Sequence, residues 1–181
     1  RYLHHLGEVT YFSPLADTSL PDAGFVYLPG GYPELYLAAL SANRQMLQSI
    51  RRYVESGGKL LAECGGMMYL CDEIRDKNGY VYPMAGVLHQ SATMENMKLR
   101  LGYRTLLYNE TRLKGHEFHY SRLVEQQNPL PSCAVAYTAK GVETDTPLYH
   151  YKNVWAGYTH LYWADPVGNE WFTKFVIDGN I

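Results

Sequence analysis

Cys64 has the surroundings of a catalytic thiol. The apolar run Lys59–Glu63 is typical of a strand, and Gly65-Gly66 follows the cysteine at the start of an expected helix. A sharp strand-to-helix turn projects its central side chain clear of the backbone, as in a nucleophile elbow. The positive end of the helix dipole favours a thiolate, and the Gly65 amide can bind a developing oxyanion. The alternative is a buried structural cysteine, the common fate of a free thiol.

A second glycine-rich loop could complete this site. Pro29-Gly30-Gly31-Tyr32-Pro33-Glu34 follows the apolar run Phe25–Leu28. In a parallel sheet, ligands bind beyond the carboxyl ends of the strands, so the amide of Gly31 is expected to lie opposite Cys64 in the oxyanion hole. Paired glycines often mark only a turn, and the prediction therefore depends on the match with Cys64.

A thiol nucleophile needs a general base, and two histidines compete for the role. His160 lies in the β-like run Val154–Trp163, and His119 lies in Gly115-His116-Glu117-Phe118-His119-Tyr120-Ser121. The residues alone leave the choice open. This second segment could also ligate a metal through His116, Glu117 and His119. No further suitable ligand is apparent to complete such a site, and we expect no metal.

Composition and charge narrow the class of protein. The chain has 181 residues, 46% of them hydrophobic, which suits one domain, 1–181, with a full core. The formal net charge of -2 gives no reason to expect nucleic acid or an anionic membrane as a partner. Three cysteines do not form a disulfide framework, so a cytoplasmic location is expected. Cys71 and Cys133 lack distinctive surroundings and are interpreted as core residues.

The order of elements predicts an α/β fold, with a mostly parallel sheet flanked by helices and a β-rich second half. The segment 1–7 is typical of a helix end closed by Gly7, so an N-terminal strand, and before it a whole domain, are expected upstream. The expected strands are Glu8–Phe12, Phe25–Leu28, Lys59–Glu63, Gly102–Tyr108, Glu117–Leu123, Ala134–Tyr137 and Val154–Trp163. The expected helices are Ser41–Ser56, Gly65–Cys71 and Asn169–Ile177.

Taken together, the motifs resemble the class I glutamine amidotransferase domain of cobyrinic acid a,c-diamide synthases. Besides those quoted, the resemblance rests on segments 12–17, 101–104 and 158–162, namely Phe-Ser-Pro-Leu-Ala-Asp, Leu-Gly-Tyr-Arg and Tyr-Thr-His-Leu-Tyr. It implies a flavodoxin-like, Rossmann-like fold in which Cys64 attacks L-glutamine, His160 is the base, and the oxyanion rests on amides near Gly31 and Gly65.

The resemblance also implies a second domain. In the family an upstream P-loop domain binds ATP and Mg²⁺ and activates the a and c carboxylates of cobyrinate for amidation by ammonia, in cobalamin biosynthesis. No Gly-x-x-x-x-Gly-Lys-Ser/Thr element occurs in this sequence. The glutaminase domain itself is therefore expected to bind no cofactor, and its partners are glutamine, the ATP-binding domain and, through that domain, the tetrapyrrole.

One position departs from the wider class I pattern. A glutamate two residues after the base usually orients it, but Tyr162 stands there. The expectation is a Cys–His dyad with no assigned third member. Further residues are candidates for contact with substrate or with the other domain: Gly30, Glu63, His116, Glu117, His119, Tyr120 and Ser121.

Other functions remain open at this point. Hydrogenobyrinate or nickel-sirohydrochlorin could replace cobyrinate as the tetrapyrrole. A DJ-1-like cysteine hydrolase or thiol sensor has a similar elbow, but it leaves the motifs of the second half unexplained. A non-catalytic assembly domain would not need Cys64, the paired glycines and His160. A homodimer is neither predicted nor excluded.

Overall fold

The chain folds around a four-stranded sheet. This computed structural model describes residues 2–178. The strands lie in the order β1 (Phe25–Leu28), β2 (Lys59–Glu63), β12 (Val154–Gly157) and β11 (Leu148–Tyr151). The first three are parallel, and β11 is antiparallel to β12. The carboxyl ends of β1, β2 and β12 therefore meet at one edge of the sheet, where sites of α/β proteins form.

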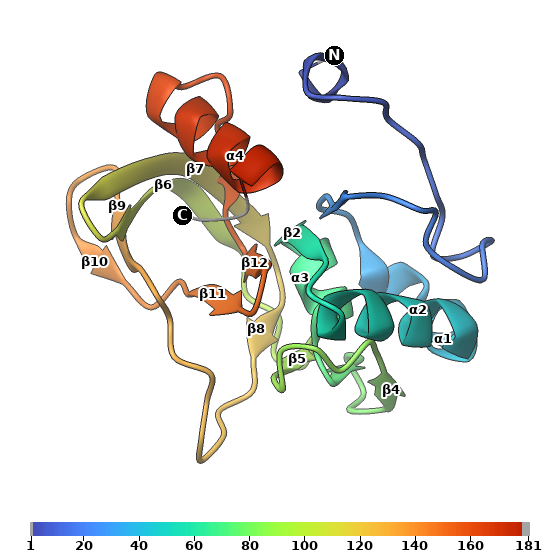
Figure 1. Cartoon of the computed structure of the whole chain (residues 1–181). Coiled ribbons are helices and arrows are strands. Elements are labelled where there is room, and N and C mark those ends of the chain that lie inside the picture. The colour runs from blue at the N-terminus through green and yellow to red at the C-terminus, as the bar shows by residue number, and fades with distance from the viewer. Residues whose placement is uncertain (1, 179–181) are drawn as a thin grey trace.

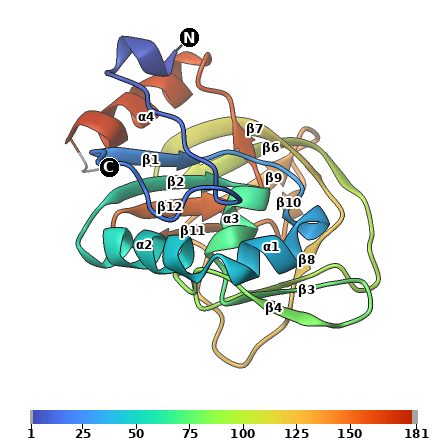
Figure 2. The same cartoon turned by 90° about the vertical axis from the view of Figure 1, so that its right-hand side faces the viewer.

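Both faces of this sheet are covered. Successive strand residues point to opposite faces, so Leu60 and Ala62 belong to one hydrophobic core and Leu61 to the other. The first core is covered by α1 (Leu37–Ala42), α2 (Arg44–Glu55) and α3 (Gly65–Leu70). On the other side lies α4 (Pro166–Asp178) (Figures 1 and 2), and its aromatic side chains belong to the second core. The predicted α/β architecture is confirmed.

The first expected helix begins differently from the prediction. The sequence predicted one helix from Ser41 to Ser56, but the structure has two, which meet at Asn43. The Asn43 side chain accepts a hydrogen bond from the Met46 amide at 3.3 Å and so caps α2. Asparagine is among the best N-caps because its oxygen binds an amide that the helix leaves unpaired. Asn43 therefore takes the N-cap position that was predicted for Ser41.

A second sheet follows in the second half of the chain. Its strands are antiparallel in the order β10 (Glu143–Thr144), β9 (Val135–Thr138), β6 (Arg100–Tyr108), β7 (Thr111–His119) and β13 (His160–Leu161). The expected strand Val154–Trp163 is thus two strands in two sheets, since the chain turns a corner at Tyr158 and Thr159. That corner carries His160 from the central sheet to the edge of β7.

A third, small sheet closes the lower part of the molecule in Figure 1. Its strands lie in the order β4 (Val81–Pro83), β3 (Glu73–Arg75), β5 (Ser91–Thr93) and β8 (Arg122–Leu123). The expected strand Glu117–Leu123 is divided between β7 and β8. The β-rich character of the second half is as predicted.

The expected strand Glu8–Phe12 is wrong. These residues are largely exposed and extended without strand pairing, with Tyr11 83% exposed. Before them, η1 (Leu3–His5) is a short 3₁₀ helix, and the Tyr2 hydroxyl lies 3.0 Å from the Thr173 hydroxyl on α4. Arg1, part of the expected helix end, lies outside the described residues.

Candidate active site

Cys64 occupies a strained turn between β2 and α3. Its φ of 49° and ψ of -111° are unusual for a residue with a side chain. The turn is fixed on both sides, because the Cys64 amide donates to Gly157 O at 2.8 Å and its carbonyl accepts from the Met68 amide at 3.0 Å. Strain held in this way concentrates at functional sites. The geometry is that of the nucleophile elbow expected from the sequence.

The two glycines after Cys64 allow close packing. A Cβ on Gly65 would lie 2.5 Å from the carbonyl oxygen of Gly31, and one on Gly66 would lie 2.3 Å from that of Leu28. Neither position can carry a side chain while α3 stays in place. Gly31 itself has open space where a Cβ would project. Gly31 and Gly65 are therefore neighbours, and the amides of the first turn of α3 have no partner within the helix.

His160 is the histidine that the fold brings to the thiol. Hydrogen bonds with the side chains of Cys64 and Glu63 raise its pKa to about 9, against the opposing effect of burial. Its ring also packs against the glycine loop, since a Cβ on Gly30 would lie 2.2 Å from Cε1 of His160. The loop after β1, the elbow after β2 and the strand after β12 thus converge on one imidazole.

Glu63 stands behind that imidazole. Its carboxylate is almost fully buried, and Oε2 lies 3.5 Å from Nδ1 of His160. The Tyr27 hydroxyl donates to Oε2 at 2.7 Å, and the Leu161 amide donates to Oε1 at 3.1 Å. These two donors fix the carboxylate toward His160. Proximity to Glu63 and burial in turn raise the pKa of Tyr27, so its hydroxyl stays a donor.

The role of Glu63 was missed by reasoning from the sequence, which gave it only as a candidate for contact with substrate or another domain. A carboxylate at the end of a strand that is otherwise apolar was the available signal, because a buried charge needs a partner. Tyr162, at the position where a class I glutamate was sought, is 41% exposed. The carboxylate beside His160 thus comes from the residue before Cys64.

The motif at residues 115–121 divides between two faces of β7. Glu117, His119 and Ser121 are buried, whereas Phe118 and Tyr120 are exposed. His116, on the outward face, stacks on His160 with ring centroids 5.0 Å apart. This alternation is the period of a strand. The outward residues are the ones exposed at the surface, and the expected contact of the inward three with substrate or with another domain stays a prediction.

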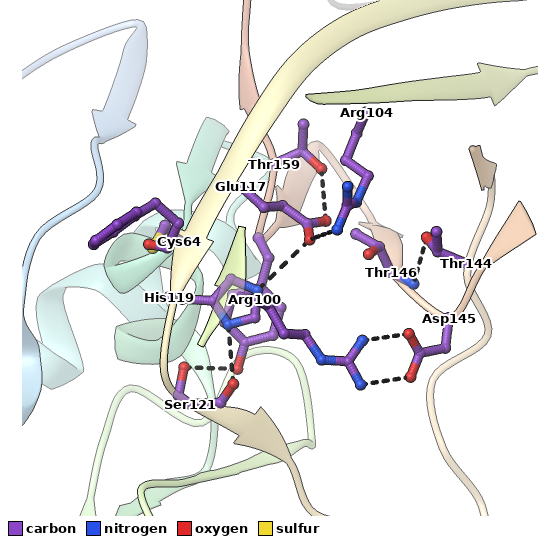
Figure 3. Close-up of polar contacts among 12 residues, drawn as sticks. Cys64, Arg100, Arg104, Glu117, His119, Ser121, Thr144, Asp145, Thr146 and Thr159 are labelled. Atoms are coloured by element: carbon purple, nitrogen blue, oxygen red, sulfur yellow. Dashed lines mark hydrogen bonds and ion pairs between the residues drawn. The ribbon is translucent and has the colours of Figure 1, made fainter. Parts of the chain in front are cut away.

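The inward residues form a buried polar cluster (Figure 3). Oε2 of Glu117 lies 3.0 Å from Nη2 of Arg104 and 3.8 Å from Nε2 of His119, and Thr159 donates to Oε1 at 3.3 Å. Burial opposes ionisation of Glu117, but the neighbouring His119 and Thr146 side chains and the Arg104 charge outweigh it, and the pKa is lowered. Glu117 is therefore a buried carboxylate with compensated charge.

His119 belongs to this cluster. Its Nδ1 lies 2.9 Å from Ser121 O, and its ring stacks on Tyr158 with a centroid separation of 3.7 Å. Both ring nitrogens thus have neighbours away from the thiol. His119 and Tyr158 form part of the wall of a cavity of about 220 Å³, which is also lined by Arg100, Arg122, Leu123, Glu125, Asp145, Thr146 and Pro147.

The other two cysteines lack activating surroundings. Burial raises the pKa of the Cys71 thiol well above its ordinary range and that of Cys133 to about 11. Within residues 2–178, no disulfide is formed, and no group of three His, Cys, Asp or Glu side chains is placed to hold a metal ion. None of the helices in that part of the chain is long and apolar enough to cross a membrane.

Comparison with known proteins gives a consistent picture. Residues 2–167 match the family model described as "CobB/CobQ-like glutamine amidotransferase domain". The chain is 39% identical over 166 residues to hydrogenobyrinate a,c-diamide synthase from Pseudomonas aeruginosa, covering 88% of this chain and 36% of that protein. It is 38% identical over 170 residues to cobyrinate a,c-diamide synthase from Fusobacterium nucleatum, covering 89% and 37%.

A solved structure shares the fold. The one described as "Crystal structure of glutamine amidotransferase" aligns with a TM-score of 0.54 at 18% identity, over 84% of this chain and 78% of the other. At that identity the likeness concerns the fold alone, and it agrees with the predicted fold class. The chain spans about a third of the length of the curated relatives it matches.

Proposed function

Since this chain belongs to the family of CobB/CobQ-like glutamine amidotransferase domains, we propose that it hydrolyses L-glutamine at Cys64. The observation that carries the proposal is one imidazole, His160, whose Nδ1 lies 3.5 Å from the Glu63 carboxylate and whose pKa is raised by the neighbouring Cys64 and Glu63 side chains. A nucleophile, a base and a group that orients the base are the minimum machinery for acyl transfer through a thioester.

The reaction follows from these positions. The Cys64 sulfur attacks the side-chain amide carbon of glutamine, and His160 holds the thiol proton. The tetrahedral oxyanion lies toward the amides of Gly31 and Gly65, which are neighbours beside the elbow. His160 protonates the leaving nitrogen, the C–N bond breaks and ammonia departs. Water, deprotonated by His160, then cleaves the glutamyl thioester to release glutamate and the thiol.

Glu63 keeps His160 in its working form. Its carboxylate favours protonation of the imidazole and fixes Nδ1, which leaves the other ring nitrogen for Cys64 and the leaving group. A pKa of about 9 keeps the proton on His160 at neutral pH. The site is then a Cys–His–Glu arrangement in which the glutamate precedes the nucleophile in the chain.

The ammonia serves a second reaction in this proposal. The relatives are named as synthases that form a,c-diamides of cobyrinate or hydrogenobyrinate, and this chain matches only about a third of each. The remaining part would bind ATP and Mg²⁺, activate the a and c carboxylates, and receive the ammonia. Assaying the complete polypeptide on cobyrinate, hydrogenobyrinate and nickel-sirohydrochlorin separates the possible acceptors.

The outward face of β6 and β7 is the proposed contact with that remaining part. Leu101 and Phe118 lie opposite each other in the hairpin, and Tyr103 lies opposite His116. Leu101 and Tyr103 are 62% and 63% exposed, and Phe118 is 40% exposed. Apolar side chains gathered beside a reaction centre suit an interface that excludes water.

Ammonia release from glutamine by the complete polypeptide tests the proposed function. Cys64→Ser is expected to lower the rate to background, and the matched Cys133→Ser variant is expected to keep it. Folding of both variants is checked by circular dichroism. Release by Cys64→Ser at the parent rate would show that the thiol is not the nucleophile.

A further inference from the structure

His116 lies against the imidazole of His160 without belonging to the group that reacts. The two residues are register partners on β7 and β13, and their rings are stacked with an interplanar angle of 23°. On the outer side His116 meets Tyr162, with ring centroids 5.8 Å apart. A cross-strand pair of this kind holds its side chains within contact distance.

The Cε1 edge of the His160 ring is bounded by the Gly30 loop. A Cβ on Gly30 would lie 2.2 Å from Cε1, 3.0 Å from Nε2 and 3.3 Å from Nδ1, so the glycine approaches between the two nitrogens. β7 and β13 also approach closely, because a Cβ on Gly115 would lie 2.3 Å from the carbonyl oxygen of His160. The His160 ring thus has the His116 ring on one face and the Gly30 loop against Cε1.

No hydrogen bond of the buried Nδ1 accounts for the position of His116. Its Nδ1 is buried and has no hydrogen-bond partner in the part of the chain that the structure describes. Burial and the nearby charge of His160 lower the pKa of His116, which makes it an uncharged ring at neutral pH. A flat uncharged ring can stack on an imidazolium without repelling it.

We propose that His116 is a positioning residue: its ring, stacked on one face of the His160 imidazole while Gly30 bounds the Cε1 edge, acts as a clamp that holds the imidazole in the plane that faces Cys64 and Glu63. The inference rests on the proposed glutaminase function, which it deepens. Without the clamp, His160 can turn out of the plane that its two hydrogen bonds require. Both hydrogen bonds then weaken, and with them the stabilisation of the protonated ring.

Other ionisable groups near His116 and His160 could also affect the titration of His160, and the experiment leaves them unchanged. Those on the neighbouring elements are Cys64, Glu63, Tyr27, Tyr103, Tyr162 and Lys114, which is paired with Asp165 at 2.9 Å. The variants below change His116 alone. A change in the His160 titration therefore reports on the clamp.

The test is an NMR titration of the His160 ring in the complete polypeptide, with the signal assigned by His160→Asn. His116→Gln lacks a ring, and His116→Phe keeps a flat ring that cannot ionise. His116→Gln is expected to lower the pKa of His160 by on the order of one unit and to lower kcat about tenfold with little change in KM. His116→Phe is expected to keep both near the parent values.

Two results would overturn the clamp. One is an unchanged His160 titration and kcat in His116→Gln, since then the stacked ring has no influence. The other is His116→Phe behaving like His116→Gln, since then a hydrogen bond or charge of His116 matters and the stack does not. The titration uses no glutamine, so it decides the clamp even if glutaminase activity is absent. Thermal unfolding of each variant excludes a folding defect as the cause.

Discussion

Glu63 Oε2 lies 3.5 Å from Nδ1 of His160, although the two residues are 97 positions apart and lie on different sheets. The contact exists because the chain leaves β12 at Gly157 and enters β13 at His160, at the edge where β2 ends. The residue before Cys64 thereby supplies the carboxylate beside His160. Four predictions follow from this arrangement and from the residues packed around it.

Replacing Glu63 by Gln removes the charge beside His160 and keeps the shape of the side chain. The pKa of His160 is then expected to fall from about 9, and kcat to fall by about 10²-fold or more, because an orienting carboxylate contributes on this scale. The alkaline limb of the pH–rate profile moves to lower pH, since His160 loses the proton meant for ammonia sooner. Steady-state ammonia release from pH 6 to 10 measures both, with exposed Glu110→Gln as control. An unshifted limb contradicts the role of Glu63.

Stability is expected to depend on pH through His160. Its folded pKa of about 9 lies above the ordinary value of 6.5, so the protonated form favours the folded state. This contribution is complete below pH 6.5 and is lost as pH rises through 9. Urea unfolding at pH 6.5, 8 and 9.5 should show a declining free energy of unfolding. The decline should be smaller in His160→Asn, and equal slopes in the two proteins would exclude His160 as its source.

Gly30→Ala is expected to displace the base. The new Cβ would lie 2.2 Å from Cε1 of His160, so the ring must leave its position against Cys64. Glutaminase kcat should fall by roughly 10²-fold, because misplacement by about 1 Å costs that much. Gly24→Ala is the matched control, since nothing lies within 4 Å of its added Cβ. Full activity in Gly30→Ala would mean that the ring tolerates another placement.

Arg104→Met is expected to destabilise the fold. It leaves Glu117, which is fully buried, without its cation. Breaking a buried pair on one side typically costs about 3–5 kcal/mol. Urea unfolding measures the loss, and exposed Arg112→Met on the neighbouring strand β7 is the control. The parent should also lose stability as pH falls through the lowered pKa of Glu117, and this acid dependence should be weaker in Glu117→Gln. A loss below about 1 kcal/mol in Arg104→Met would contradict a compensated buried charge.

Local sequence was enough to predict the elbow at Cys64 and most of the fold. An apolar strand, Gly-Gly and a short helix specify that turn by themselves, and the strand–helix rhythm specifies the sheet around it. The choice between His160 and His119 could not be made locally, because it depends on which face of which sheet each histidine occupies. The two-residue period of β7 does predict that Glu117 and His119 share a face.

Two features were beyond local reasoning for physical reasons. Glu63 reaches His160 only because Tyr27 and the Leu161 amide hold its carboxylate, and these two donors come from two other elements, β1 and β13. The corner at Tyr158 and Thr159 interrupts an unbroken β-like run. Pairing partners decide where such a run changes sheets, and its own residues do not.

The central claim is that Cys64 is the nucleophile, and peptide mapping after treatment with a glutamine-directed alkylating analogue tests it most directly. The complete polypeptide is treated with the analogue with and without excess glutamine, and modified cysteines are located by mass spectrometry. The account predicts one adduct, on Cys64, that glutamine suppresses, with Cys71 and Cys133 unmodified because burial keeps them as thiols. An adduct on either of those two that glutamine suppresses, with Cys64 unmodified, would contradict it.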